Sequence, residues 1–237
     1  MAMSEASSHR GSGGLVVPLV VATALLMENL DSTVLTTAIP TIARDVGSDP
    51  VHLKLALTAY LMSLAIFIPA SGWVADRLGA HRVFIAAIGV FTVASALCAL
   101  SQSLPQLVCA RVLQGIGGAM MTPVGRIIVV RSRDKRELLD AMSWITIPAL
   151  LGPILGPPLG GLVITYATWH WIFLINIPIG LVGMILSWRL LPTFPVVVRR
   201  FDAVGFALSG AGLSLVVVTA SLLSVVICAR ARSGSSR

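Results

Sequence analysis

Two carboxylates lie deep inside an apolar segment near the start of the chain. The segment runs from Leu15 to Ile39 and contains Glu28 and Asp31. About 20 apolar residues span a bilayer as a helix, and an ionisable side chain inside such a helix costs roughly 2.5 kcal/mol or more. Residues three apart share one helix face. We therefore predict that both acids face a bundle interior or a wet cavity, as an ion or substrate site. The alternative is an interfacial pair near a helix end, because Pro40 follows soon after.

A guanidinium lies at a matching depth in a later apolar segment, which begins near Leu104. At about 1.5 Å per residue, Arg111 lies roughly 10 Å inward from that end, and Asp31 lies roughly 13 Å inward from Pro40. Buried charges are tolerated chiefly as pairs. The depths predict that Arg111 is the counter-ion of Asp31, with Glu28 about one turn deeper. Either the pair binds a proton and releases Arg111, or it is a permanent ion pair that only locks the two helices together.

Composition identifies the elements that must position these groups. The chain is 56% hydrophobic and 11% charged, with a mean hydropathy of +0.92. Its long uncharged blocks lack the alternation of an outer-membrane barrel, and helices satisfy their own backbone in lipid. The sequence predicts an all-α polytopic membrane protein. The net charge of +7 does not indicate a nucleic-acid partner, because Lys and Arg are confined to short connections, where they set topology.

Seven apolar segments and their connections define the expected organisation. Most of the Lys and Arg lie in the N-terminal tail and in the connections between the second and third, fourth and fifth, and sixth and seventh segments. This distribution predicts a protein of the cell membrane with a cytoplasmic N-terminus. Helices 1 to 3 and 4 to 6 form two triplets that enter from opposite faces, which fits a 3+3 inverted repeat. The expected parts are a polar tail (1–14), a six-helix N-terminal bundle (15–191), a cytoplasmic linker (192–202), a seventh helix (203–229) and a basic Ser-rich tail (230–237).

The fifth apolar segment carries glycines four residues apart. Gly152, Gly156 and Gly160 form one small-residue stripe, which allows close helix packing in lipid. Pro153, Pro157 and Pro158, which we place within the same stripe, remove backbone donors and should bend the helix. We interpret this helix as a pivot for gating; static packing is the alternative.

Five patterns in order resemble the N-terminal half of the major facilitator superfamily, in its fourteen-helix drug:proton antiporter branch of the EmrB/QacA type. A helix 1 signature, a charged loop after helix 2, a helix 4 motif, a Gly-Pro antiporter motif and a helix 6 entry are all similar to that branch. They lie at Leu30–Val34 with Ala38–Pro40, Gly72–Arg82, Leu107–Gly118, Gly152–Gly161 and Trp169–Gly180.

The resemblance implies a six-helix half-bundle that exports small amphipathic or cationic compounds, in the cell inner membrane, and so contributes to drug resistance. It implies proton coupling at Asp31 assisted by Arg111, with the proton gradient as energy source and no cofactor. It also implies an inner gate and an antiporter helix. The gate residues would be Gly72, Asp76, Arg77, Gly79 and Arg82, and those of the antiporter helix Gly152, Pro153, Gly156, Pro157, Gly160 and Gly161.

Three features depart from the family's pattern. Ala80 and His81 replace basic residues of the loop motif, and Glu28 is not part of the usual signature. The chain ends one helix after its first half, so we expect a truncated product that needs a second half-transporter or a homodimer. A non-transporting fragment that interacts with full-length relatives, and a carrier of sugars or metabolites, are the alternatives. An enzyme is not expected, because no nucleophile or paired-acid arrangement is present.

Overall fold

A computed structural model describes residues 10–134, 136–196 and 202–234 of the chain. Parts of the predicted terminal tails, together with Lys135, Arg199 and Arg200, lie outside the described residues. The described part is helical, and six helices are long and apolar enough to cross a membrane, so the chain is a multi-pass all-α membrane protein. The bounds are α1 Arg10–Asp45, α2 Pro50–Leu78, α3 Ala80–Ala99, α4 Leu104–Arg131, α5 Leu138–Tyr166, α6 His170–Leu174, α7 Asn176–Leu190 and α8 Ala203–Gly234.

The first and sixth helices differ from their predicted course. The sequence predicts an end of the first helix before Pro40, but α1 continues through this proline to Asp45. Proline is tolerated inside membrane helices because neighbouring helices and hydroxyl side chains compensate for the freed backbone groups. The sequence predicts one sixth helix, but the structure divides it into α6 and α7 at Ile175, and the two segments together form one span, His170–Leu190. Residues Val204–Thr219 of α8 form a shorter apolar helix.

Local sequence explains where α2 begins and how it turns into α3. Asp49 caps the N-terminus of α2, where its side chain accepts a hydrogen bond of 2.8 Å from the Val51 N–H, and Pro50 occupies the first turn. Gly79 alone separates α2 from α3, with a φ of +90° that side chains other than glycine rarely adopt. The two helices therefore reverse direction within a single residue.

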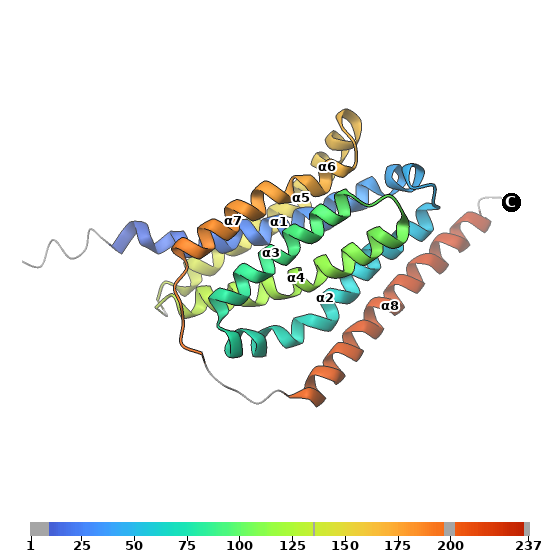
Figure 1. Cartoon of the computed structure of the whole chain (residues 1–237). Coiled ribbons are helices and arrows are strands. Elements are labelled where there is room, and N and C mark those ends of the chain that lie inside the picture. Colours follow the sequence, from blue (N-terminus) through green and yellow to red (C-terminus); the bar gives the residue numbers. More distant parts are fainter. Residues whose placement is uncertain (1–9, 135, 197–201, 235–237) are drawn as a thin grey trace, which may run out of the picture.

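The helices pack as a bundle in which α4 lies between α2 and α3 (Figure 1). The most extensive contact is between α1 and α5, and α3 also packs on α7. α8 lies along the outside of α2. This arrangement places side chains from α1, α3, α4 and α7 in one interior.

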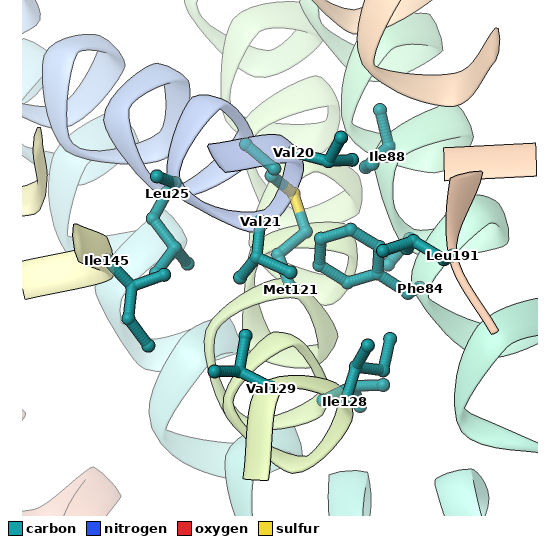
Figure 2. Close-up of a cluster of buried hydrophobic side chains, with 14 of the residues drawn as sticks. Val20, Val21, Leu25, Phe84, Ile88, Met121, Ile128, Val129, Ile145 and Leu191 are labelled. Atoms are coloured by element: carbon teal, nitrogen blue, oxygen red, sulfur yellow. The ribbon is translucent and has the colours of Figure 1, made fainter. Parts of the chain in front are cut away.

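Two separate hydrophobic clusters fill that interior. The first contains Val21 and Leu25 of α1, Phe84 of α3 and Met121 and Val129 of α4 (Figure 2). The second lies toward the other end of the same helices. It includes Cys98 and Ala99 of α3, Leu107 and Ala110 of α4, and, from α1, Val34, Leu35, Ala38, Ile42 and Ala43. Between the two clusters, each of these three helices contributes a buried polar side chain.

Candidate functional site

A buried polar layer separates the two hydrophobic clusters. Along α1, Asp31 lies between residues of the first and second cluster, and Arg111 on α4 and Ser95 on α3 occupy the same position on their helices. Asp31 is 2% exposed, and both Arg111 and Ser95 are 0% exposed. A charged layer with apolar packing on both sides lies well away from both ends of the bundle, where water is least available.

Asp31 and Arg111 form an ion pair between α1 and α4. The Arg111 Nη1 donates to the Asp31 Oδ2 over 2.5 Å, and both side chains are fully buried. The pairing predicted from helix depth is therefore present. Compensation of the desolvation cost requires that the remaining lone pairs of the carboxylate also be hydrogen-bonded.

Two amides complete the shell of the Asp31 carboxylate. Gln114 Nε2 and Asn176 Nδ2 donate to Asp31 Oδ1 over 2.9 and 2.8 Å. The same two amides donate to Ser95 Oγ, over 2.8 and 3.3 Å, so α3 and α7 are tied to the layer as well. The Asp31 carboxylate is thus held by one guanidinium and two amides, and these come from α4 and α7.

Arg111 also has aromatic neighbours and N–H groups without a hydrogen-bond partner. Its Nη1 donates to Gln114 Oε1 over 2.6 Å, and its guanidinium lies 4.1 Å from the Tyr60 ring centroid and 5.9 Å from that of Phe173. Nε and Nη2 of Arg111 are buried without a hydrogen-bond partner among the described residues. Aromatic faces stabilise a cation that lacks water. The Nε and Nη2 nitrogens of Arg111 remain available as donors to another acceptor.

Sequence reasoning found two of these residues and missed the others. Gln114 lies three residues after Arg111 and therefore shares its helix face, and Asn176 lies within the helix 6 entry pattern, but the sequence assigned no role to either. Ser95 and Tyr60 carried no charge signal. Their place in the layer depends on how α2, α3 and α7 pack, which the spacing within one helix does not specify.

Glu28 contacts a different position of α4 from Asp31. Its Oε2 accepts a hydrogen bond of 2.8 Å from Thr122 Oγ1, on the side of the ion pair that leads toward the first hydrophobic cluster. Both acids therefore contact α4, Asp31 through Arg111 and Gln114 and Glu28 through Thr122. They have separate partners, so the carboxylates do not form one shared site.

The glycine stripe of α5 packs against α1. A side chain at Gly152, Gly156 or Gly160 would collide with Asn29, Thr33 or Thr37. In addition, Thr33 Oγ1 donates to Gly152 O over 3.2 Å. The four-residue spacing therefore marks the face of α5 that meets α1.

The prolines of α5 do not share this stripe. The prediction of one stripe that holds both residue types is wrong, because Pro153 and Pro157 are exposed while the three glycines are buried. A helix turns about 100° per residue, so Pro153 and Pro157, each one residue after a stripe glycine, point to another face. Gly161 also lies off the stripe and has nothing within 4 Å of its Cβ position.

The predicted gate residues are only partly connected. Asp76 accepts from Arg131 Nη2 of α4 over 2.8 Å, a partner that the sequence did not indicate. The Arg77 guanidinium lies 5.1 Å from the Trp73 ring centroid, and Arg82 is exposed. Gly79 makes the tight turn between α2 and α3, whereas Gly72 has open space at its Cβ position.

Comparison with known proteins agrees with this architecture. The sequence model of the Major Facilitator Superfamily matches residues 21–229. Proteins named "Putative multidrug resistance protein MdtD" from Salmonella paratyphi B, Salmonella newport and Salmonella typhimurium are each 46% identical to the chain over 199 residues. The match covers 84% of this chain and 42% of each relative, so the chain spans less than half the length of these relatives.

Proposed function

Because this chain belongs to the Major Facilitator Superfamily, we propose that it forms the N-terminal half of a proton-coupled exporter of small amphipathic or cationic compounds. Members of this superfamily are transporters, which agrees with the prediction that the chain is not an enzyme. The printed name of the Salmonella relatives supports drug-like substrates. The chain covers 42% of the length of those relatives, and the proposal concerns this part.

The observation that carries the proposal is the buried Asp31 carboxylate, held by Arg111, Gln114 and Asn176 between two hydrophobic clusters. An intramembrane carboxylate with a defined partner is the usual basis of a proton relay. A proton on Asp31 removes its negative charge and weakens its hold on Arg111. Arg111 then needs another acceptor, and its Nε and Nη2 groups have none in the described bundle.

Movement of Arg111 would alter the contact between α1 and α4 and, through Gln114 and Asn176, the contacts with α3 and α7. Alternating access in such carriers rocks one bundle against another around a midplane site. Protonation of Asp31 would therefore favour one orientation of the bundle over the other by changing these contacts. The glycine stripe between α5 and α1 would let the two helices pivot while they stay in close contact.

A complete transport path needs a second bundle. We propose that the chain binds either a complementary C-terminal half or a second copy of itself, and that its N-terminus is cytoplasmic. Substrate would bind between the two bundles, with Glu28 as a further acidic contact for a cation. Asp76, Arg77 and Arg82, next to the Gly79 turn, would contribute to the inner gate, with Arg131 as the partner of Asp76.

The experiment is dye efflux in membrane vesicles from cells that express the chain alone or together with the C-terminal part of an MdtD relative. An imposed pH gradient should drive ethidium transport with the combined halves, and Asp31→Asn should abolish it. The matched control is Asp45→Asn, the same change at an exposed position at the end of α1. This control should leave transport unchanged.

Equal ethidium flux in the unaltered chain and in the Asp31→Asn variant would remove Asp31 from the mechanism, provided that gel filtration shows both chains folded. The alternative of a non-transporting fragment predicts no flux in any combination, and a stable monomer that never binds the C-terminal half. Its support is the 42% coverage of the relatives. Flux of a sugar or metabolite instead of ethidium would indicate the other substrate class.

A further inference from the structure

An apolar groove runs between α2 and α3, with α4 as its floor. Its volume is about 390 Å³, and it is open on one side. α2 and α3 each pack extensively on α4 but contact each other much less, so they diverge from the Gly79 turn. The lining side chains are almost entirely apolar. They include Val74, Leu78, Ala86, Val90, Gly117 and Met120.

The floor of the groove is fixed by close packing of α4 on α3. A Cβ at Gly117 would lie 2.8 Å from the Phe91 N and 2.9 Å from the Ala87 O. Because Gly117 has no side chain, α4 packs directly against the α3 backbone at this point. The groove is therefore a formed feature of the bundle and not a gap between loosely packed helices.

One charged residue lines this apolar groove. Arg82, in the first turn of α3, lines it and is exposed. Val90 lies eight residues further along α3, or about 12 Å, which is most of the roughly 15 Å thickness of one leaflet's hydrocarbon region. The groove thus places an arginine at headgroup level and apolar walls along the path of an acyl chain.

Charge near this end favours an anion. Asp76 is the one acidic residue between Val51 and Arg133 in the sequence. Its carboxylate pairs with Arg131. Arg77, Arg82 and Arg131 together outnumber it by two positive charges. Basic pockets between transmembrane helices bind anionic lipid headgroups, with about 1 kcal/mol for each Lys or Arg near the surface.

We propose that this groove binds one anionic phospholipid, with an acyl chain between α2 and α3 and its headgroup phosphate on Arg82. The apolar lining excludes a polar solute, and the arginine distinguishes this lipid from the neutral lipids that cover other exposed faces. The inference is independent of the proposed transport function, because it concerns the outer face of the bundle and not the Asp31 layer.

The test is native mass spectrometry of the full 237-residue chain in a neutral detergent, titrated with phosphatidylglycerol or phosphatidylcholine of identical acyl chains. We expect one phosphatidylglycerol to bind about five-fold more tightly than phosphatidylcholine, the ratio that about 1 kcal/mol gives. Arg82→Gln should remove this difference and Arg82→Lys should keep most of it. Ala86→Trp, which fills the groove, should weaken both lipids, and Val90→Phe is a second filling variant if the first does not fold.

Matched controls change the same residue types elsewhere. Arg44→Gln removes an exposed arginine at the opposite end of the bundle, and Val93→Trp adds bulk to the exposed face of α3 outside the groove. Neither should alter lipid binding. The proposal is overturned if both lipids bind equally and Arg82→Gln has no effect, or if the controls weaken binding as much as the groove variants. Tetraphenylphosphonium, a hydrophobic cation, is titrated as a further probe. The proposal is also overturned if Ala86→Trp weakens binding of this cation and leaves binding of both lipids unchanged.

Discussion

Arg111 is fully buried, and among the described residues its carboxylate partner is Asp31. Removal of one partner from a buried pair leaves an uncompensated charge, whereas replacement of both by apolar groups is often neutral. This asymmetry separates two roles that the sequence left open. A pair that only locks α1 to α4 can be replaced as a pair, but a pair that binds a proton cannot.

We predict that Asp31→Asn destabilises the bundle by about 3–5 kcal/mol, because it leaves Arg111 charged without a counter-ion. The double variant Asp31→Leu with Arg111→Met should cost less than either single change. It should not be fully neutral, because Gln114 and Asn176 lose an acceptor. Thermal unfolding in detergent micelles measures these differences.

The comparison control is Asp76→Asn at the partly exposed Asp76–Arg131 pair, where the loss should be at most about 1 kcal/mol. Transport by the Asp31 single variant and by the Asp31/Arg111 double variant then separates a structural lock from a proton-binding site. Full ethidium efflux by the double variant, combined with the C-terminal half, would mean that the pair is a structural lock. Loss of efflux in a stably folded double variant supports proton binding at Asp31.

Gln114 is the amide that links three members of the layer. It donates to Asp31 and to Ser95 and accepts from Arg111. Gln114→Leu should cost about 1–3 kcal/mol, because buried partners lose hydrogen bonds that water cannot replace. Gln106→Leu, on the same helix but exposed, should change the unfolding temperature little. Equal losses for the two variants would contradict the role given to the layer.

At the residue scale, the sequence predicts charged partners better than neutral ones. Asp31 and Arg111 are conspicuous because a charge in an apolar segment is costly, and helix rise alone gives their depth. The uncharged side chains carry no such burial cost, so nothing in the sequence marks Gln114, Ser95 or Asn176 as members of the layer. Only the packing of α3 and α7 against α1 and α4 determines that they meet the carboxylate.

α5 and α1 form the most extensive contact among the helices, and small residues on α5 allow it. Gly152, Gly156 and Gly160 lie against residues 29, 33 and 37 of α1. Their spacing of four residues predicted this face correctly, because a stripe of that period stays on one side of a helix. The neighbouring prolines lie on another face of α5, so they do not take part in the contact.

We predict that Gly156→Ala destabilises the bundle by about 1–3 kcal/mol, the usual cost of overpacking. The added methyl would collide with the Thr33 side chain, including its Cβ at 2.6 Å. Gly161→Ala is the matched control, since it has open space and alanine is the better helix former by about 1 kcal/mol. Unfolding temperatures should fall for the first and stay or rise for the second.

Thr33→Ala in the Gly156→Ala background should recover part of the loss if the collision causes it. No recovery, together with a similar loss for Gly161→Ala, would mean that α5 responds to any added bulk.

Helix ends were harder to predict than helix faces. Pro40 indicated an end of α1 that the structure does not have, because a proline in a membrane helix can be accommodated by its neighbours. A stripe such as that of α5 repeats over several turns, so several residues support the same prediction. A helix end depends on one or two residues, and packing can override them.

At the scale of the whole molecule, the charged layer divides the bundle into two apolar halves. α1, α3 and α4 each pass from one hydrophobic cluster through the layer to the other. The all-helical class and the number of spanning segments followed from composition and segment length. The convergence of four helices on one layer did not, because it depends on their relative positions (Figure 1).

The two ends of the bundle differ in charge, which is the basis of the proposed orientation. Arg77, Arg82 and Arg131 lie at the end where α2 and α4 finish and α3 begins. Arg44 and Lys54 lie at the other end, near the α1–α2 connection. Short cytoplasmic loops carry an excess of Lys and Arg, so the first end should be cytoplasmic.

Single-cysteine variants test this orientation, starting from a chain in which Cys98, Cys109 and Cys228 are replaced by serine or alanine. His52→Cys and Asp134→Cys place the thiol at exposed positions at opposite ends of the bundle. In intact cells a membrane-impermeant maleimide should label the first variant and not the second, because of these two sites only the one next to the α1–α2 connection should face outward. Inverted vesicles should give the reverse pattern. Labelling of the Asp134→Cys variant in intact cells would place the arginine-rich end outside and overturn the proposed topology, together with the inner gate assigned to that end.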